Sequence, residues 1–320
     1  MSAQRIRLAG DLAAKIGADL CSVVDAGNGW PTTMRMRIGD EDRLVDCYVS
    51  LVGSHARRDY ELRFQNPAQE DQRLIERRGN AIPLLVGVSR KDDGDLVAVV
   101  PDTDRRVGNT NRFSVLFRKE LVDDARDNHW SDYHSSTGEV ITAVSPTLLP
   151  YFIMLRLEGV AVPLADVRVA IADTVSDEGA ITEISRRAVM RVVRDARFRK
   201  SVVVAYSGRC VLCGLNWGLI EAAHIYPISA PSSSDAVANG LGLCGNHHAL
   251  FDAHRIHIDP SNLQVSLDRD LWVQPGPAGL TFLNGTADRL RFPAVVNERV
   301  SRQWLERRYN WFEQKYGWVG

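Results

Sequence analysis

Three stretches decide the fold of the C-terminal part of this chain: RCVLCG at residues 209–214, IEAAHIYP at 220–227 and ANGLGLCGNHHALFDAHRIHID at 238–259. They hold three of the five cysteines and five of the eight histidines. Cys210 and Cys213 form a C-x-x-C pair, and Cys244 and His247 form a C-x-x-H pair. Thiolate and imidazole are the usual ligands of structural zinc, and the two-residue spacing lets one tight turn aim both ligands at one point. The two pairs predict a tetrahedral zinc site, with buried free cysteines as the alternative.

Three other polar residues lie between and just after these pairs. His224 begins His-Ile-Tyr-Pro, Asn239 begins Asn-Gly-Leu, and His248 directly follows the last expected zinc ligand. Together with the two pairs, this order and spacing resemble the HNH (ββα-metal) endonuclease family over about residues 195–262. The resemblance implies that His224 is the general base and that His248 binds the catalytic ion. It also implies that Asn239 either holds the loop and orients His224, or binds the ion directly.

The residue types suit phosphodiester hydrolysis. The reaction needs a water activated near neutral pH, for which imidazole has a suitable pKa. It also needs a cation to stabilise charge on the phosphorane and on the leaving 3′ oxygen. Many family members carry Asp or His just before the base, where this chain has Ala223. We therefore expect fewer protein ligands, with water and phosphate completing the shell, which suits magnesium. Glu221 is a reserve ligand, and Asp252, His254 and His257 are further polar groups near the site.

Length predicts two domains, and the pattern of expected strands and helices along the chain predicts the α+β class. We expect a mixed, strand-rich domain at 1–158, a linker at 159–182, and a zinc-stapled ββα-metal nuclease domain at 183–320 with its core at 195–262. No apolar run reaches the roughly 18 residues that span a bilayer, and the N-terminus lacks a signal-peptide apolar region. We therefore expect no membrane association and a cytoplasmic location, where thiols stay reduced.

Local patterns predict individual elements. Residues 1–25 carry the apolar spacing of a helix, and 82–87 and 96–100 are apolar runs typical of buried strands. We expect helices at 119–129 and 301–316, and a loop-rich segment at 268–296 because of its prolines and glycines.

The N-terminal region also resembles, less specifically, a region that accompanies HNH nucleases in restriction-type proteins. The segments that carry this likeness are ELRFQNP at 61–67, PLLVGV at 83–88, NTNRFSVLF at 109–117 and YHSSTGEVITAV at 133–144. The resemblance implies that the N-terminal domain chooses the DNA and that the HNH domain cuts it.

Arginines are the candidate DNA contacts. The net charge of −1 is not typical of a nucleic-acid-binding protein, so local patches of positive charge must bind the DNA. Residues 184–200 predict a basic helix suited to the phosphate backbone. The candidates are Arg57, Arg58, Arg63, Arg105, Arg106 and Arg112 in polar loops and strands, and Arg186, Arg187, Arg191 and Arg194 in the basic helix. The alternative for each is a solvated surface arginine. Trp130, Tyr133 and His134 could stack on a flipped base, or belong to the core.

The leading interpretation is a restriction-type, metal-dependent DNA endonuclease with one structural Zn²⁺ and a catalytic Mg²⁺ or other divalent ion. Its partner would be double-stranded DNA. Because one ββα site cuts one strand, we expect a homodimer for a double-strand cut. Two alternatives remain open: an HNH nuclease that is ligand-triggered or directed at RNA, and a non-catalytic, zinc-stapled DNA-binding protein, which Ala223 would favour.

Overall fold

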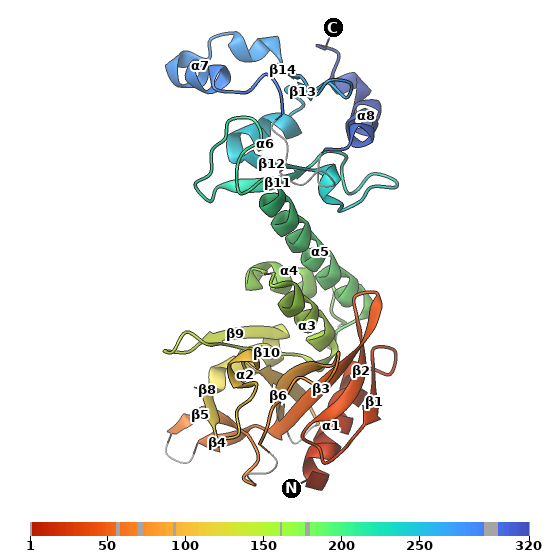
Figure 1. The fold of residues 1–320 in the computed structure, drawn as a ribbon, viewed down its shortest axis with the longest axis vertical. Helices are drawn as coiled ribbons and strands as arrows, with labels where there is room; N and C mark the ends of the chain where they lie inside the picture. Colours follow the sequence, from red (N-terminus) through yellow and green to blue (C-terminus); the bar gives the residue numbers. More distant parts are fainter. Residues whose placement is uncertain are drawn as a thin grey trace. The chain divides into compact units, whose positions relative to one another are not determined.

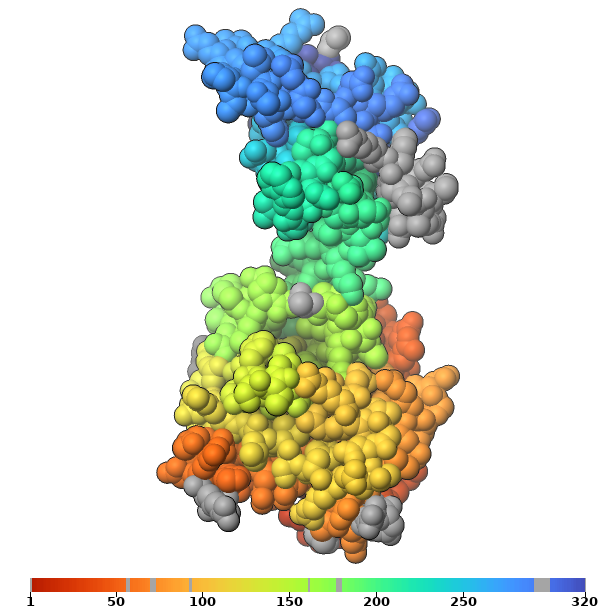
Figure 2. All heavy atoms as spheres, turned by 60° about the vertical axis from the view of Figure 1, so that its left-hand side comes forward, coloured from red at the N-terminus to blue at the C-terminus, as the bar shows by residue number. Residues whose placement is uncertain are grey.

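The computed structural model describes residues 2–55, 58–69, 73–91, 94–160, 162–176, 180–290 and 300–319. The remaining residues are drawn in grey in Figures 1 and 2. The chain divides into two compact units, Met1–Val193 and Arg194–Gly320. The division falls within helix α5 (Glu183–Ala205), further along the chain than the linker expected at 159–182. That expected linker instead contains helix α4 (Leu164–Ala172), which packs against strand β9 of the first unit.

The first unit is built on a mixed sheet of seven strands in the order β1-β2-β3-β6-β7-β10-β9 (Figure 1). Neighbouring strands are antiparallel except β3 and β6, which are parallel. Every residue of β7 is buried, as expected for an apolar run inside a covered sheet. The strands are β1 (Cys21–Asp25), β2 (Thr32–Ile38), β3 (Glu41–Leu51), β6 (Ile82–Arg90), β7 (Leu96–Val100), β9 (Trp130–His134) and β10 (Val140–Val144).

A smaller sheet and three further helices complete this unit. The smaller sheet has the order β4-β5-β8, with β4 (Gly53–His55), β5 (Arg58–Gln65) and β8 (Ser114–Arg118). Helix α1 (Ser2–Ile16) packs against β1 and β3, and α2 (Lys119–Asn128) packs against β9 and β10. Helix α3 (Leu149–Glu158) packs against β2. The N-terminal region is therefore rich in strands, and the mixed α+β class is confirmed.

The helix predicted over residues 1–25 is correct for α1 and wrong beyond it. Gly17 has a φ of +109°, a conformation that glycine adopts readily and that interrupts the helix. Cys21–Asp25 then pairs with β2 as an edge strand. The apolar residues of this segment therefore serve two elements rather than one continuous helix.

The second unit contains a hairpin of β11 (Ile220–His224) and β12 (Gly240–Cys244), followed by α6 (Gly245–Asp252). Helix α6 contacts both strands, which is the ββα order expected from the sequence (Figure 1). The unit continues with β13 (Ile256–Ile258), β14 (Val265–Leu267), α7 (Gly276–Asn284) and α8 (Arg302–Trp311). The loop-rich assignment at 268–296 is wrong for α7: Pro277 lies in the first turn of this helix, where its missing N–H costs nothing.

Short 3₁₀ segments within the described residues lie between or after these elements, at Asp104–Arg106, Pro146–Leu148, Val237–Asn239, Arg269–Trp272 and Glu313–Lys315. Across the described ranges, no helix is both long and apolar enough to cross a bilayer.

Two glycines let α5 lie directly against β12. A Cβ on Gly240 would meet Val202 Cγ2 at 2.4 Å and Phe198 at 3.0 Å, and a Cβ on Gly242 would meet Tyr206 at 2.9 Å. These separations are too short for any larger residue without movement of the helix. The Gly-x-Gly spacing of β12 therefore brings Phe198 of α5 close to the hairpin that carries His224.

Candidate active site and metal site

Cys210, Cys213, Cys244 and His247 form a compact cluster whose ligand atoms all lie within 4.8 Å of one another. Sγ of Cys213 lies 3.9 Å from Sγ of Cys244, and Nδ1 of His247 lies 3.5 Å from Sγ of Cys210 and 3.2 Å from Sγ of Cys244. A tetrahedral zinc ion with Zn–S bonds of about 2.3 Å and a Zn–N bond of about 2.0 Å places its sulfurs about 3.8 Å apart and nitrogen about 3.5 Å from sulfur. The four residues fit a tetrahedral metal site.

The surroundings of this cluster favour a cation. Burial raises the pKa of the Cys210 thiol, but hydrogen bonds from His247 and from backbone N–H groups bring it down to about 6. Burial, together with the neighbouring Cys210 and Cys244, raises the pKa of Cys213 to about 12. Nε2 of His247 lies 2.9 Å from the Thr286 hydroxyl, which leaves Nδ1 directed at the thiols. A divalent ion would displace the remaining protons and hold all four ligands.

His224 ends β11 and is held on two sides. Its Nε2 lies 3.0 Å from Oδ1 of Asp235, and its ring stacks on Phe198 with centroids 3.8 Å apart and planes 8° apart. Nδ1 of His224 has no hydrogen-bond partner among the described residues. If Asp235 accepts the Nε2–H, Nδ1 carries the free lone pair and can accept a proton.

Asn239 is fully buried and its side-chain amide is engaged with the loop that follows β11. Its Oδ1 accepts the N–H of Tyr226 at 2.8 Å, and its Nδ2 donates to the carbonyl oxygens of Tyr226 at 3.0 Å and Ser234 at 2.8 Å. The amide therefore ties the two ends of the segment between His224 and Asp235 together.

His248 lies on α6 between two carboxylates. Its Nδ1 is 2.6 Å from Oε2 of Glu221, and its Nε2 is 3.3 Å from Oδ2 of Asp252, one helical turn later. Neighbouring ligand atoms around an octahedral ion with bonds of about 2.1 Å lie about 3.0 Å apart. Nε2 of His248 and Oδ2 of Asp252 are therefore spaced for one shared cation.

His224 and His248 line the same cavity, which has a volume of about 410 Å³. Asp252 and Arg199 also line it. Ala222, not Ala223, lies on its wall, because Ala223 is packed into the core of the unit. The position just before the base therefore faces away from the cavity.

Arg308 of α8 reaches this cavity from inside the protein and is 2% exposed. Its guanidinium donates to the carbonyl oxygen of Ile225 at 3.0 Å and to that of Phe251 at 2.6 Å. These two residues directly adjoin His224 and Asp252 in the chain. Arg308 forms no ion pair with a described residue, so its positive charge remains on the cavity wall. Burial, and after it the charge of Arg308, lowers the pKa of His254, which lines the same cavity.

Five of the ten candidate DNA-binding arginines are engaged within the protein. Arg106 makes two hydrogen bonds to Glu139, and Arg105 pairs with Asp102 at 3.2 Å. Arg58 pairs with Glu61, and Arg186 and Arg187 both pair with Glu183. The four that form no ion pair with any described residue are Arg63, Arg112, Arg191 and Arg194. Arg57 lies outside the described residues.

The aromatic candidates of β9 separate in the structure. Trp130 is 5% exposed and lines a cavity of the first unit, Tyr133 packs against that unit's core, and His134 is exposed.

Comparison with known proteins bears on both units. Residues 210–259 match the family model described as HNH endonuclease. The match covers the cysteine cluster together with His224, Asn239, His248 and Asp252.

Residues 210–259 form an HNH endonuclease domain.

The chain is therefore a nuclease, and the HNH domain contains both the residues that could hold a metal and the histidines that line the cavity. Residues 45–153 of the first unit match a second family model, described as Methylase-associated X1. A solved structure described as a modification dependent TagI restriction endonuclease is 16% identical, over 84% of this chain and 81% of that chain, with a TM-score of 0.30. Because this TM-score is low, we infer neither fold nor function from that likeness. No curated protein matches the chain significantly.

Sequence reasoning missed Asp235, and it named Asp252 only as a further polar group near the site, without pairing it with His248. Asp235 lies in a serine-rich loop with no distinguishing motif, so only the fold brings it to His224. The pairing of Asp252 with His248 could have been predicted from the sequence, because residues four apart on a helix share one face and His248 precedes Asp252 by four residues.

Proposed function

We propose that this protein is a metal-dependent endonuclease of restriction type that hydrolyses double-stranded DNA, with its target chosen by the first unit. The observation that carries the proposal is the shared cavity. His224 from β11 and the His248–Asp252 pair from α6 lie on its wall. A base and a cation site facing one space are what hydrolysis of a phosphodiester requires.

His224 acts as the general base in this proposal. Asp235 accepts the Nε2–H of His224 and Phe198 fixes the plane of the ring, which leaves Nδ1 to accept a proton from the attacking water. Asn239 acts through the loop: its bonds to Tyr226 and Ser234 hold the segment that carries Asp235. Since its amide oxygen already accepts a backbone N–H, we assign Asn239 to positioning rather than to the ion.

His248 and Asp252 would hold the divalent ion through Nε2 and Oδ2. A cation bound there would stabilise negative charge on the phosphorane and on the leaving 3′ oxygen. Glu221 accepts the Nδ1–H of His248, which fixes the imidazole tautomer and makes Nε2 a better ligand. Mg²⁺ suits a site with few protein ligands because it keeps several waters.

Zinc is the ion that best fits the cluster of Cys210, Cys213, Cys244 and His247, because three thiolates and one imidazole are a common structural zinc set. A reducing cytoplasm would keep these thiols available for it. The cluster joins the segment before β11, which carries Cys210 and Cys213, to the end of β12 and the start of α6, so zinc would support the elements that carry His224 and His248.

The four arginines that form no ion pair with a described residue are the proposed contacts to the DNA backbone. Arg191 and Arg194 are exposed on α5, whereas Arg63 and Arg112 line a cavity of about 210 Å³ in the first unit. Removing one arginine that binds a phosphate should reduce the slope of log affinity against log salt by about one. Arg191→Ala and Arg194→Ala should do so, while Arg187→Ala, whose charge pairs with Glu183, is the matched control.

Cleavage of DNA in a defined metal tests the proposal. Supercoiled plasmid and phage DNAs, unmodified or carrying modified cytosine or adenine, would be incubated with Mg²⁺, Mn²⁺ or Ni²⁺. Discrete, metal-dependent fragments are expected, and intact DNA under every condition would overturn the proposal. A double-strand cut needs two active sites. We therefore also expect the protein to sediment as a homodimer when it is bound to a DNA that it can cleave.

A further inference from the structure

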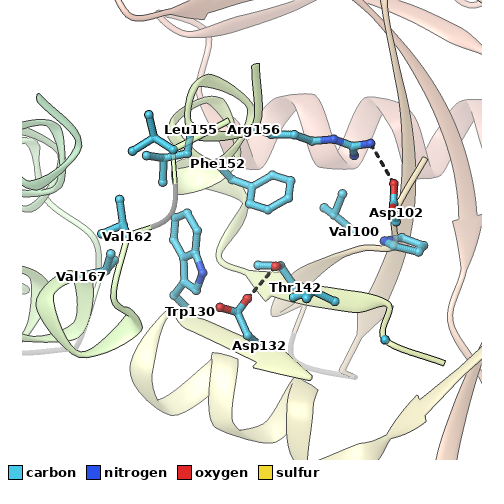
Figure 3. Close-up of a pocket in the computed structure, with 14 residues that line it drawn as sticks. Val100, Asp102, Trp130, Asp132, Thr142, Phe152, Leu155, Arg156, Val162 and Val167 are labelled. Carbon is cyan, nitrogen blue, oxygen red and sulfur yellow. Dashed lines mark hydrogen bonds and ion pairs between the residues drawn. The ribbon is translucent and has the colours of Figure 1, made fainter. Parts of the chain in front are cut away.

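A second cavity lies wholly within the first unit and has a volume of about 420 Å³. Strand β9 contributes Trp130 and Asp132, β10 contributes Thr142, and α3 contributes Phe152 and Arg156 (Figure 3). The Trp130 and Phe152 rings lie side by side, with centroids 5.8 Å apart and planes tilted by 57°. The nuclease chemistry of the HNH domain uses none of these residues.

The cavity is lined mostly by apolar side chains, together with one carboxylate oxygen that is available to accept a hydrogen bond. Oδ1 of Asp132 accepts a 2.6 Å hydrogen bond from the Thr142 hydroxyl, whereas Oδ2 has no partner among the described residues. Arg156 does not offer a positive charge to a ligand, because its guanidinium lies 3.4 Å from Asp102 and 3.0 Å from Asp104. The available polar group is therefore a carboxylate beside aromatic rings, as Figure 3 shows.

This lining selects for a flat, uncharged ligand that donates hydrogen bonds. A phosphate or another anion would face the carboxylates of Asp132 and Asp102 with no free cation among the described lining residues. A planar heterocycle can lie against Trp130 and Phe152, and an amino group at its edge can donate to Oδ2 of Asp132. Cavities of this size, mostly apolar with a few convergent polar groups, are typical small-molecule sites.

We propose that this cavity binds a nucleobase with an exocyclic amino group, of the cytosine or adenine kind, extruded from the DNA that the enzyme cuts. The inference rests on the proposed function, which supplies DNA as the partner. Extruded bases are read by stacking and by hydrogen bonds to their Watson–Crick edge, which is what Trp130, Phe152 and Asp132 offer. A free nucleoside has the same chemistry, so the experiment must separate the two sources.

Binding of mismatched duplexes provides the test, because a mismatched base costs least to extrude. The protein would carry His224→Ala to prevent cutting. The probes are duplexes of about 30 base pairs that are fully matched, or that contain one central C·C, A·C or T·T mismatch. We expect the C·C and A·C duplexes to bind about tenfold more tightly than the matched duplex. The T·T duplex, whose bases lack an amino group, should gain much less.

Variants of the lining should remove this preference without removing general DNA binding. Asp132→Asn keeps the bond to Thr142 and removes the carboxylate, and Trp130→Phe keeps an aromatic ring if Trp130→Ala fails to fold. Asp132→Asn and Trp130→Ala should bring the C·C and A·C duplexes close to the matched one, and Trp130→Phe, with its smaller ring, should reduce the preference. His134→Ala is the matched control, because His134 is on the same strand, exposed, and outside the cavity. Thermal melting would confirm that each variant is folded.

Free deoxycytidine and deoxyadenosine, titrated calorimetrically, distinguish the source of the base. Competition by these nucleosides that disappears in Asp132→Asn, without a mismatch preference, would support the cavity chemistry but overturn the extruded base. Equal binding of all duplexes and no nucleoside binding would overturn the proposal entirely, and so would a preference unchanged in Asp132→Asn and Trp130→Phe. These experiments measure binding alone. The base-binding proposal can therefore fail while DNA cleavage succeeds, and DNA cleavage can fail while the base-binding proposal holds.

Discussion

Nε2 of His224 lies 3.0 Å from Oδ1 of Asp235, across the loop that joins β11 to β12. A carboxylate that accepts one imidazole N–H fixes which nitrogen remains basic and stabilises the imidazolium that forms when the other accepts a proton. The pairing turns a histidine at the end of a strand into an oriented base. It also gives Asp235 a role that no motif in the sequence indicates.

Asp235→Asn should therefore reduce the rate of DNA cleavage by about 10²-fold or more, since positioned acid–base groups contribute about 10²–10⁴-fold. The affinity for DNA should change little, because Asp235 serves the proton transfer. Single-turnover cleavage at saturating metal would measure the rate. Asp270→Asn, an exposed carboxylate outside the cavity, is the control. An unchanged rate in Asp235→Asn would show that the ion pair is only structural.

The carboxylates on either side of His248 should both affect metal dependence, one as a ligand and one as the partner of the histidine. Asp252→Asn removes a proposed ligand and should raise the metal concentration for half-maximal cleavage by more than about tenfold. Glu221→Gln removes the hydrogen-bond partner of Nδ1 of His248. It should raise that metal concentration by about 10–100-fold, which is the usual effect of removing the hydrogen-bond partner of a metal-bound histidine. Titration of cleavage against Mn²⁺ would measure both. If neither variant shifts the titration, the ion is held elsewhere.

The cysteine cluster should contain about one zinc ion per chain. Removing zinc with a strong chelator should unfold the HNH domain, because metal-binding free energy in such small sites is largely folding free energy. Elemental analysis and circular dichroism would follow zinc content and helicity together. Cys213→Ser should show reduced zinc content and a lower melting temperature. A folded protein with no bound zinc would contradict the assignment.

Gly240→Ala should destabilise the HNH domain by about 1–3 kcal/mol, the usual range for inserting atoms into a packed core. The added Cβ would meet Val202 at 2.4 Å, so α5 or β12 must shift, and Phe198 would shift with them. Gly245→Ala is the matched control, because Gly245 is the first residue of α6 and the nearest atom to its added Cβ would be 3.8 Å away. Thermal unfolding of the two variants gives the comparison, and equal melting temperatures would refute the close approach.

The sequence predicted the HNH domain well because its motifs are local and interlocked. Cys210, Cys213, Cys244 and His247 have spacings that only a shared metal explains readily, and the structure brings all four together. The ββα order around them is confirmed by β11, β12 and α6. The buried strands β6 and β7 were equally readable, because continuous apolar runs leave few alternatives.

Tertiary relationships were not readable from the sequence. Arg106 looks like any other loop arginine, yet it is paired with Glu139, 33 residues away. Ala223 looked like a lost metal ligand, but the pleat of β11 turns it into the core and leaves His224 on the cavity. Arg308 reaches the cavity from the closing helix and binds the carbonyl of Ile225, which precedes it by 83 residues. Such relationships depend on packing between distant segments, which no local pattern encodes.

The central claim is that His224 performs the chemistry of DNA cleavage. The most direct measurement compares wild-type protein with His224→Ala on the same supercoiled plasmid at saturating Mg²⁺ or Mn²⁺, with DNA affinity measured for both. The proposal predicts that cleavage falls by about 10²-fold or more while affinity stays nearly unchanged. Equal cleavage by both proteins, or a fall in affinity that matches the fall in cleavage, would contradict it.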